Sequence, residues 1–140
     1  MAITQSMTSS FKPEVLGGIH DLDTDAIYIA LYVSTATLSA ATTAYAATDE
    51  VATAGGYVAG GILLTTPVIS LDGTTGICDF ADATWPAATI TARGALIYNS
   101  TKANRAIAVL DFGSDKTSTA GDFTVIMPAA AAATALVRIA

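Results

Sequence analysis

Thr89–Phe112, TITARGALIYNSTKANRAIAVLDF, is the stretch that decides the fold. It holds two apolar segments, Ile90–Tyr98 and Arg105–Phe112, on either side of a polar link, NSTKAN, at 99–104. The Ile, Val, Leu, Tyr and Phe side chains suit a pleated surface better than a helix, and the Asn and Ser residues of the link favour turn geometry. The stretch therefore predicts a β-hairpin with a loop of about five residues.

Both faces of this hairpin are apolar. In the first segment Ala95 and Ile97 share one face, and Leu96 and Tyr98 share the other. Across the turn, alternation places Ile107 with Val109 on one face and Ala106, Ala108 and Leu110 on the other. A strand pair that is apolar on both faces needs cover on both sides. We therefore expect the hairpin to be central, with Ile97 and Val109 in the core.

The composition indicates a protein that does not stay alone. The 140 residues are most simply one domain, and 13% of them are charged, against about 25% in ordinary soluble domains. The mean hydropathy is +0.54. A monomer usually carries more charge to stay apart from its neighbours, so we expect part of the surface to be subunit interface in a homo-oligomer. Two-fold and three-fold assemblies are both open.

The charge distribution disfavours nucleic acid as a partner. The net charge is −6, and the six cations form no run, so a polyphosphate would be repelled at long range. A cationic partner surface remains open. The first 14 residues, MAITQSMTSSFKPE, lack the basic start and apolar core of a signal peptide. No apolar run approaches the ~18 residues of a membrane span, so we expect no membrane partner and synthesis in a cytoplasm.

The N-terminal third contains one helix signal and one strand signal. Ser9-Ser10 precede Phe11–Leu16 as a cap precedes a short helix, and Gly17-Gly18 end it. Ile27–Val33 alternates with period two, which predicts a strand.

Residues 34–61 have a different texture. Thr, Ala and Gly dominate and no period is visible, over a length unusual for an idle loop. We interpret the segment as an extended intersubunit arm or loop, ordered against a neighbouring copy; plain disorder is the alternative. Gly55-Gly56 and Gly60-Gly61 predict bends where backbones approach closely.

The remaining chain predicts short strands. Ile62–Thr66 is one, and Val68–Leu71 with Gly76–Phe80 forms a second hairpin around the turn signal Asp72-Gly73. Trp85-Pro86 closes that unit, with Trp85 as a core anchor.

Phe123–Met127 and Ala135–Ile139 are the last two strands, and an alanine helix over 129–135 is the alternative between them. About eight short strands and one helix predict a mainly β protein, an antiparallel β-sandwich or barrel-like fold.

No constellation of residues predicts catalysis or a cofactor. His20 is the only histidine, and no Gly-x-Ser-x-Gly elbow accompanies it; we interpret it as a polar residue between helix and strand. Asp21, Asp23 and Asp25 have a D-x-D-x-D spacing, but the sixth-position glycine and twelfth-position acid of a calcium loop are missing. A solvated loop is the expected reading, and no metal site is predicted.

Two single residues and one short motif complete the set of candidate sites. Cys78 is alone and excludes an intrachain disulfide; a small buried hydrophobe is expected. Arg93 is expected to pair with Asp79 or Asp111, or to anchor an interface. The sequon Asn99-Ser100-Thr101 means little without a secretory signal.

Taken in order, four stretches carry a family resemblance. They are the motif Ser10-Phe11-Lys12 with Gly18-Ile19-His20-Asp21, then IALYVSTATL, then GYVAGGILL, then TARGALIYNSTKANRAIAVLDFGSDKTSTAGDFTVIMP. Over residues 10–127 this order resembles small structural proteins encoded by tailed bacteriophages. The resemblance implies a virion component, and proteins of this size that decorate or cement capsids are usually β-rich and oligomeric.

The resemblance implies a capsid decoration or cement protein that binds between capsomers and stabilises the head. Its partners would be the major capsid protein or other virion proteins, and its location the virion. The alternative is a tail or head-fibre component that recognises a host-surface glycan; no segment of the sequence decides between head and tail. An enzyme is not expected. Exposed aromatic side chains beside a polar groove would favour glycan recognition, whereas flat apolar ends and extended arms would favour a cement protein.

Overall fold

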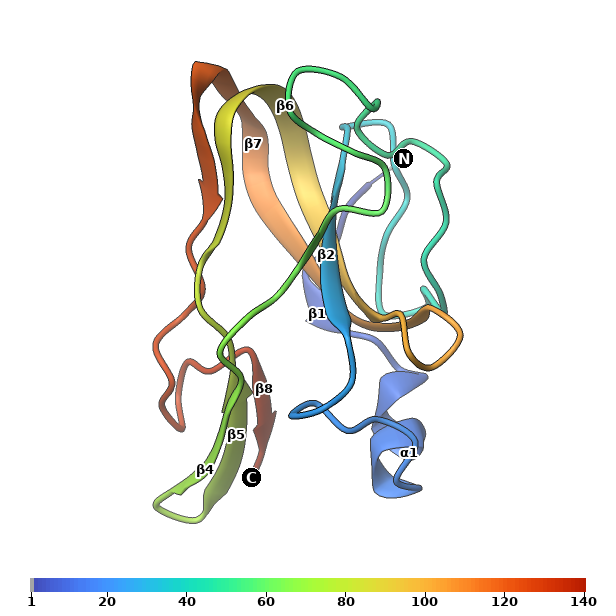
Figure 1. Cartoon of the computed structure of the whole chain (residues 1–140). Helices are drawn as coiled ribbons and strands as arrows, with labels where there is room; N and C mark the ends of the chain where they lie inside the picture. The colour runs from blue at the N-terminus through green and yellow to red at the C-terminus, as the bar shows by residue number, and fades with distance from the viewer. Residues whose placement is uncertain (1) are drawn as a thin grey trace.

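Two antiparallel sheets and one short helix make up the described part of the chain, residues 2–140 of a computed structural model (Figure 1). The larger sheet has the strand order β1-β7-β6-β2-β3, and the smaller has the order β4-β5-β8. The elements in chain order are β1 (Ser6–Met7), α1 (Phe11–Leu16), β2 (Ile27–Tyr32), β3 (Ile62–Leu63), β4 (Val68–Asp72), β5 (Thr75–Asp79), β6 (Ala83–Asn99), β7 (Arg105–Val125) and β8 (Val137–Ile139). The mainly β, antiparallel fold predicted from the sequence is confirmed; the sheets do not close into a barrel.

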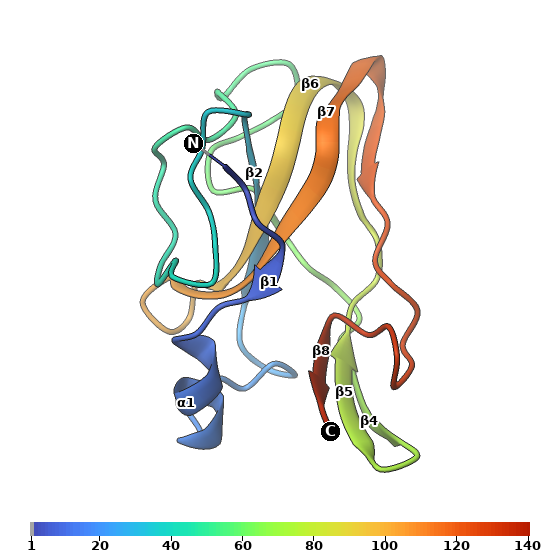
Figure 2. The same ribbon diagram turned by 180° about the vertical axis from the view of Figure 1, so that it is seen from behind.

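The predicted central hairpin is one part of a longer one. β6 has 17 residues and β7 has 21, and each has a strand neighbour on both sides over part of its length. A flat strand of 17 residues would be about 55 Å long, yet Ala83 and Ile97 belong to one core cluster. The strands therefore fold over, as the curved ribbons in Figures 1 and 2 show.

The fold-over coincides with a break in strand register. Ala92 lies opposite Lys116 and Gly94 lies opposite Asp111, so β7 carries extra residues at this point. Gly113, with φ of 80°, lies among them. Gly94 also has no room for a side chain, because a Cβ there would lie 2.6 Å from the Leu110 carbonyl oxygen. Small residues thus let the two strands turn sharply while staying paired.

A second irregularity corrects the predicted faces of the hairpin. Ile97 pairs with Ala108 and Tyr98 pairs with Ala106, so Ile107 is the extra residue of a bulge. Ile107 and Ala108 consequently lie in the same core cluster as Ile97, whereas Val109 lies on the opposite face. Simple alternation predicts Ile107 and Val109 on the same face of the strand, and this prediction is wrong. The predicted burial of Ile97 and Val109 is confirmed, since both are fully buried.

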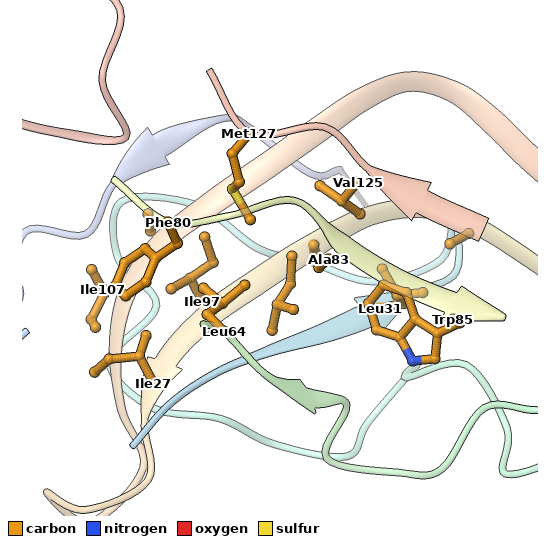
Figure 3. Packing of buried hydrophobic residues seen from close by; sticks show 14 of the residues in the cluster. Ile27, Leu31, Leu64, Phe80, Ala83, Trp85, Ile97, Ile107, Val125 and Met127 are labelled. Carbon is orange, nitrogen blue, oxygen red and sulfur yellow. The ribbon is translucent and has the colours of Figure 1, made fainter. Parts of the chain in front are cut away.

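The main core lies between the two layers made by the folded-over hairpin. Figure 3 shows Ile97, Ile107 and Leu31 of one layer facing Phe80, Val125 and Trp85 of the other. Trp85 is buried and packs edge-on against Phe123, with ring centroids 6.1 Å apart. The predicted anchor is confirmed. Trp85-Pro86, however, lies inside β6 and closes no unit; Pro86 is tolerated because the register shifts between Trp85 and Ala88.

The opposite face of the larger sheet is covered by residues 34–48. Ala36 and Leu38 of this segment pack with Tyr32, Leu96 and Val109 in a second cluster of buried residues. Backbone bonds fix the segment at both ends: Thr4 N–H donates to the Leu38 carbonyl, and Tyr45 N–H to the Asn104 carbonyl. The hairpin is therefore covered on both faces, as its composition predicts.

The contacts expected between 34–61 and a neighbouring subunit are made within the chain. Val33 N–H donates to the Asp49 carbonyl, Val51 N–H donates to the Leu31 carbonyl, and Tyr57 is buried in the main core. These contacts order the segment within a single copy of the chain. A contact of 34–61 with another copy stays a prediction.

The glycine pairs in this segment make the predicted close approaches. A Cβ on Gly61, which has φ of 79°, would overlap the Ile29 carbonyl oxygen, and a Cβ on Gly55 would lie 2.6 Å from the Thr89 carbonyl oxygen. Only glycine lets the loop lie this close to β2 and β6.

The shorter helix and strands form close to where the sequence predicts them, but several begin or end at other residues. Helix α1 forms as predicted and ends in a Schellman arrangement, with Ile19 N–H donating to the Glu14 carbonyl and Gly18 at φ of 74°. Ser10 is the N-cap, but its side chain makes no capping bond. The hairpin around Gly73 is confirmed. Phe123 to Val125 is the end of β7 and not a separate strand, and in the described chain residues 129–135 form turns and no helix.

Candidate functional site

His20 lies in a buried polar network between α1 and the β6–β7 turn. Its Nε2 is 3.0 Å from Glu14 Oε1, and its Nδ1 is 3.1 Å from Asn99 Nδ2. Because the Asn99 amide donates to Nδ1, the ring proton lies on Nε2 and is donated to Glu14. The Phe11 ring packs beside it, with centroids 4.9 Å apart. Both ring nitrogens are thus engaged. His20 lies between the helix and β2, as predicted, and it also joins the helix to the β6–β7 hairpin, which was not predicted.

The loop of Asp21, Asp23 and Asp25 is held by bonds to two of its own carboxylates, those of Asp21 and Asp25. Asp21 Oδ1 accepts from the N–H groups of Asp23 and Thr24, at 3.1 and 3.2 Å. The Thr24 side chain, followed by these two backbone bonds, lowers the pKa of Asp21. Asp25 Oδ2 accepts from Asn99 Nδ2 at 2.7 Å. Partial burial raises the pKa of Asp25, but the Asn99 bond and the other donors outweigh it and lower the pKa overall. Within residues 2–140 no three His, Cys, Asp or Glu side chains are grouped to hold a metal ion.

Cys78 and Asp79 sit at the junction of the two sheets. Cys78 is buried, as predicted, and burial raises the pKa of its thiol to about 12, so the reactive thiolate does not form near neutral pH. Asp79 is also buried; its Oδ1 accepts from Phe80 N–H at 2.9 Å, and its Oδ2 has no partner. Burial raises the pKa of Asp79. Arg93 pairs with Asp111, Nε to Oδ1 at 3.6 Å, and not with Asp79.

Glu50 lies at the centre of a hydrogen-bonded cluster that was not predicted from the sequence. Its carboxylate accepts from the hydroxyls of Tyr45 and Tyr57 and from Gly60 N–H, each at 2.6 Å. Burial, followed by the Glu50 hydrogen bond, raises the pKa of both tyrosines. Tyr45 also stacks on Tyr98, with centroids 4.7 Å apart, and Tyr98 donates to the Gly60 carbonyl. The hydroxyls of these three tyrosines are therefore used to hold the 45–60 segment against the sheet.

A groove of about 1090 Å³ opens along β7, where the sandwich does not close. Both halves of the folded-over strand line it, through Leu110, Phe112 and Phe123, and the C-terminal segment adds Leu136 and Arg138. Lys116 and Asp122 also line it, so its walls are of mixed polarity.

The smaller sheet carries most of the exposed large aliphatic side chains on strands. Strand register puts Ile69, Leu71 and Ile139 on one face, in the rows Ile69–Cys78–Val137 and Leu71–Gly76–Ile139. Cys78 and Val137 reach the main core, but the second row extends beyond it, with Leu71 70% and Ile139 55% exposed. We call Ile69, Leu71 and Ile139 the apolar face. In Figure 1 this sheet projects from the lower part of the molecule.

All the exposed large hydrophobic residues in the described chain are aliphatic. Outside the small sheet they are Leu16, Val58, Leu63 and Ile126. The combination that would favour glycan recognition, exposed aromatic rings beside a polar groove, is therefore not found among residues 2–140.

The sequence predicts this surface only in part. It indicates a strand at Val68–Leu71, but a strand alone does not show which of its faces is covered. The exposure follows from the length of the small sheet beyond the core, which only the three-dimensional arrangement reveals.

Comparison of the chain with protein-family models, curated proteins and solved structures finds no match. Within residues 2–140 no helix has the length and hydropathy needed to cross a bilayer.

Proposed function

We propose that this chain is a structural protein of a tailed-bacteriophage virion, a capsid decoration or cement protein that binds between capsomers and stabilises the head. The observation that carries the proposal is the apolar face of the small sheet, which projects from the core with Leu71 and Ile139 more than half exposed. An exposed aliphatic surface of this kind is typical of a protein–protein contact. The resemblance of residues 10–127 to small phage structural proteins agrees with it.

The chemistry elsewhere on the chain is consistent with a binding role. The polar groups that could serve catalysis, His20 and the aspartate loop, are engaged in intrachain bonds. The low charged fraction of 13% also suits a protein whose surface is covered by partners.

Stabilisation of the head would follow from mass action. A subunit that binds the assembled shell and not its free components stabilises the shell by about 2.7 kcal/mol per site when its free concentration is 100-fold above its Kd. Many sites on one particle would add up, so a modest contact per subunit is sufficient.

A tail or head-fibre component that recognises a host glycan is the second candidate. The partly exposed ring of Tyr45 is the feature that favours it, because aromatic rings can pack on sugar faces. We place it second because this ring already stacks on the buried Tyr98 and its hydroxyl donates to Glu50.

Binding to particles that lack the protein tests the proposal. Purified protein is mixed with such heads, and binding is followed by co-sedimentation and by the temperature at which the heads lose their DNA. The wild-type protein should bind and raise that temperature, whereas Ile139→Ser should bind at least about tenfold more weakly, because it removes an aliphatic anchor worth more than about 1.4 kcal/mol.

Val58→Ser is the matched control. Val58 is 64% exposed, similar to Ile139, but lies in the 55–61 loop and not on the small sheet. It should bind like the wild type. Equal binding by wild type and Ile139→Ser, or no binding by the wild-type protein, would contradict the proposal.

A further inference from the structure

Strand β4 has a free edge that lacks the usual protection. It is the first strand of the small sheet, so one of its edges has no neighbouring strand among the described residues, and all five of its residues are exposed. Natural edge strands are kept from pairing by lysine, proline, bulges or very short length. Asp72, beside the turn, is the only charged residue of β4, none of the five is proline, and the register with β5 is continuous.

The other strand edges are protected. β1 and β3, at the borders of the larger sheet, are two residues long. β8 is three residues long and carries Arg138. The free part of β7 carries charges at Asp115, Lys116 and Asp122.

The pairing of the β4–β5 hairpin shows which backbone N–H and C=O groups of β4 point toward the free edge. Asp72 and Thr75 flank a two-residue loop and pair directly, so they exchange both backbone hydrogen bonds, and bonded pairs alternate from there. Ser70 and Val68 therefore bond to β5. The N–H and C=O groups of Ile69 and Leu71 point away from β5, toward the free edge.

We infer that β4 pairs antiparallel with β4 of a second copy of this chain, about a two-fold axis at Ser70. In this register Ile69 faces Leu71 of the second copy and exchanges two hydrogen bonds with it. The symmetric pair does the same, so four outward N–H groups find acceptors. Ser70 faces its own counterpart in the non-bonded position, where Cα atoms lie about 4.5 Å apart.

Charge and side chains agree with this register. Asp72 would face Val68 of the second copy, so the two carboxylates lie at opposite ends, and Asp72 Oδ2 already accepts from Ala132 N–H at 2.6 Å. No other charge lies on the strand, although the chain as a whole carries −6. Like charges, which would oppose the contact, are therefore kept apart at this edge.

Pairing through the β4 edges leaves the apolar face of each copy exposed. It also brings the two apolar faces side by side. The three-stranded sheets become one six-stranded sheet, on which Ile69, Leu71 and Ile139 of each copy form one continuous surface. The pairing stands on the sheet edge alone. Its use as a two-fold platform on a capsid shell rests on the function proposed above.

The contact is small, so the dimer should depend on concentration. One five-residue strand edge per copy is well below the ~20–30 residues a side of a standard interface. Sedimentation velocity on the isolated protein should show a monomer–dimer equilibrium. A protein that stays monomeric up to its solubility limit would overturn the inference.

Charge at the axis tests the register. Ser70→Asp and Ser70→Lys each place like charges directly opposite each other, and each should weaken the dimer more than about tenfold. An equimolar mixture should recover a one-to-one dimer, because opposite charges then face each other. Dimerisation of Ser70→Asp as tight as that of the wild type would overturn the register.

A cysteine at the axis gives an independent readout with almost no change in shape. The Cα separation expected at Ser70 lies within the range of a disulfide, so Ser70→Cys should form a covalent dimer under mild oxidation. Val68→Cys is the control, since its counterpart in the second copy is Asp72 and not itself. The native Cys78 is buried and should not react. Equal cross-linking of the two variants would refute the two-fold axis. These experiments contain no particle, so their outcome is separate from that of head binding.

Discussion

Replacing Glu50 by alanine should release the 45–60 segment from the sheet. The Glu50 carboxylate accepts three hydrogen bonds of 2.6 Å, from Tyr45, Tyr57 and Gly60. Hydrogen bonds to a charged group contribute about 1.5–3 kcal/mol each. Because Glu50 is partly exposed, the lower figure applies, and the three bonds together stabilise the fold by about 4.5 kcal/mol. That is a large part of the 5–15 kcal/mol typical of a domain.

Urea denaturation measures the loss, and limited proteolysis shows where it occurs. Glu50→Ala should unfold at lower urea and be cleaved first within residues 34–61. Asp49→Asn is the control: Asp49 is exposed, accepts one bond from the Thr35 hydroxyl, and has φ of 59°, a conformation that Asn tolerates. The free energy of unfolding of Asp49→Asn should lie within about 0.5 kcal/mol of that of the wild type. A Glu50→Ala protein as stable as Asp49→Asn would refute the attachment of this segment to its own sheet.

Three further predictions concern the core and its polar groups. Ile97→Ala should cost about 2–5 kcal/mol in unfolding free energy; an unchanged melting temperature would contradict its central place. Gly61→Ala should cost more than about 3 kcal/mol, whereas Gly113→Ala, with φ of 80° and open space around it, should cost about 1 kcal/mol; equal losses would show that the contact with β2 is loose. Because burial raises the pKa of Asp79, its ionisation destabilises the folded state as pH rises above the ordinary value of about 4. Asp79→Asn should therefore gain in melting temperature over the wild type as pH increases, and a pH-independent difference would argue against a buried carboxylate.

The hairpin could be predicted because its signals are local. Residues 90–98 and 105–112 are rich in side chains that suit a strand, and the Asn and Ser residues between them mark the turn. The bulge at Ile107 could not be predicted in the same way. It depends on which register lets both Ile107 and Ala108 reach the main core, and that is a property of the packed layers.

The full length of β7 could not be predicted from the sequence, for a different reason. From Gly113 to Gly121 the strand is made of small and polar residues, most of them exposed, so the stretch has no apolar period and looks like a loop. Pairing with β6 holds it extended, through Thr91 with Thr117 and Ala88 with Gly121.

Residues 34–61 escaped prediction because their anchors are few and irregularly spaced. Leu38, Val51 and Tyr57 are each buried at a separate place, and Glu50 acts through tyrosines from distant parts of the segment. His20 is similar: nothing near it in sequence indicates that Asn99, 79 positions away, completes its hydrogen bonds. The polar character of both regions could be read from the sequence, but their partners could not.

Electron cryomicroscopy of the intact particle tests the central claim most directly. A map of the virion should show this protein on the outer surface of the head, between capsomers, with the apolar face of Ile69, Leu71 and Ile139 turned toward the shell. Its absence from the particle, or density for it only in the tail or its fibres, would contradict the proposed role.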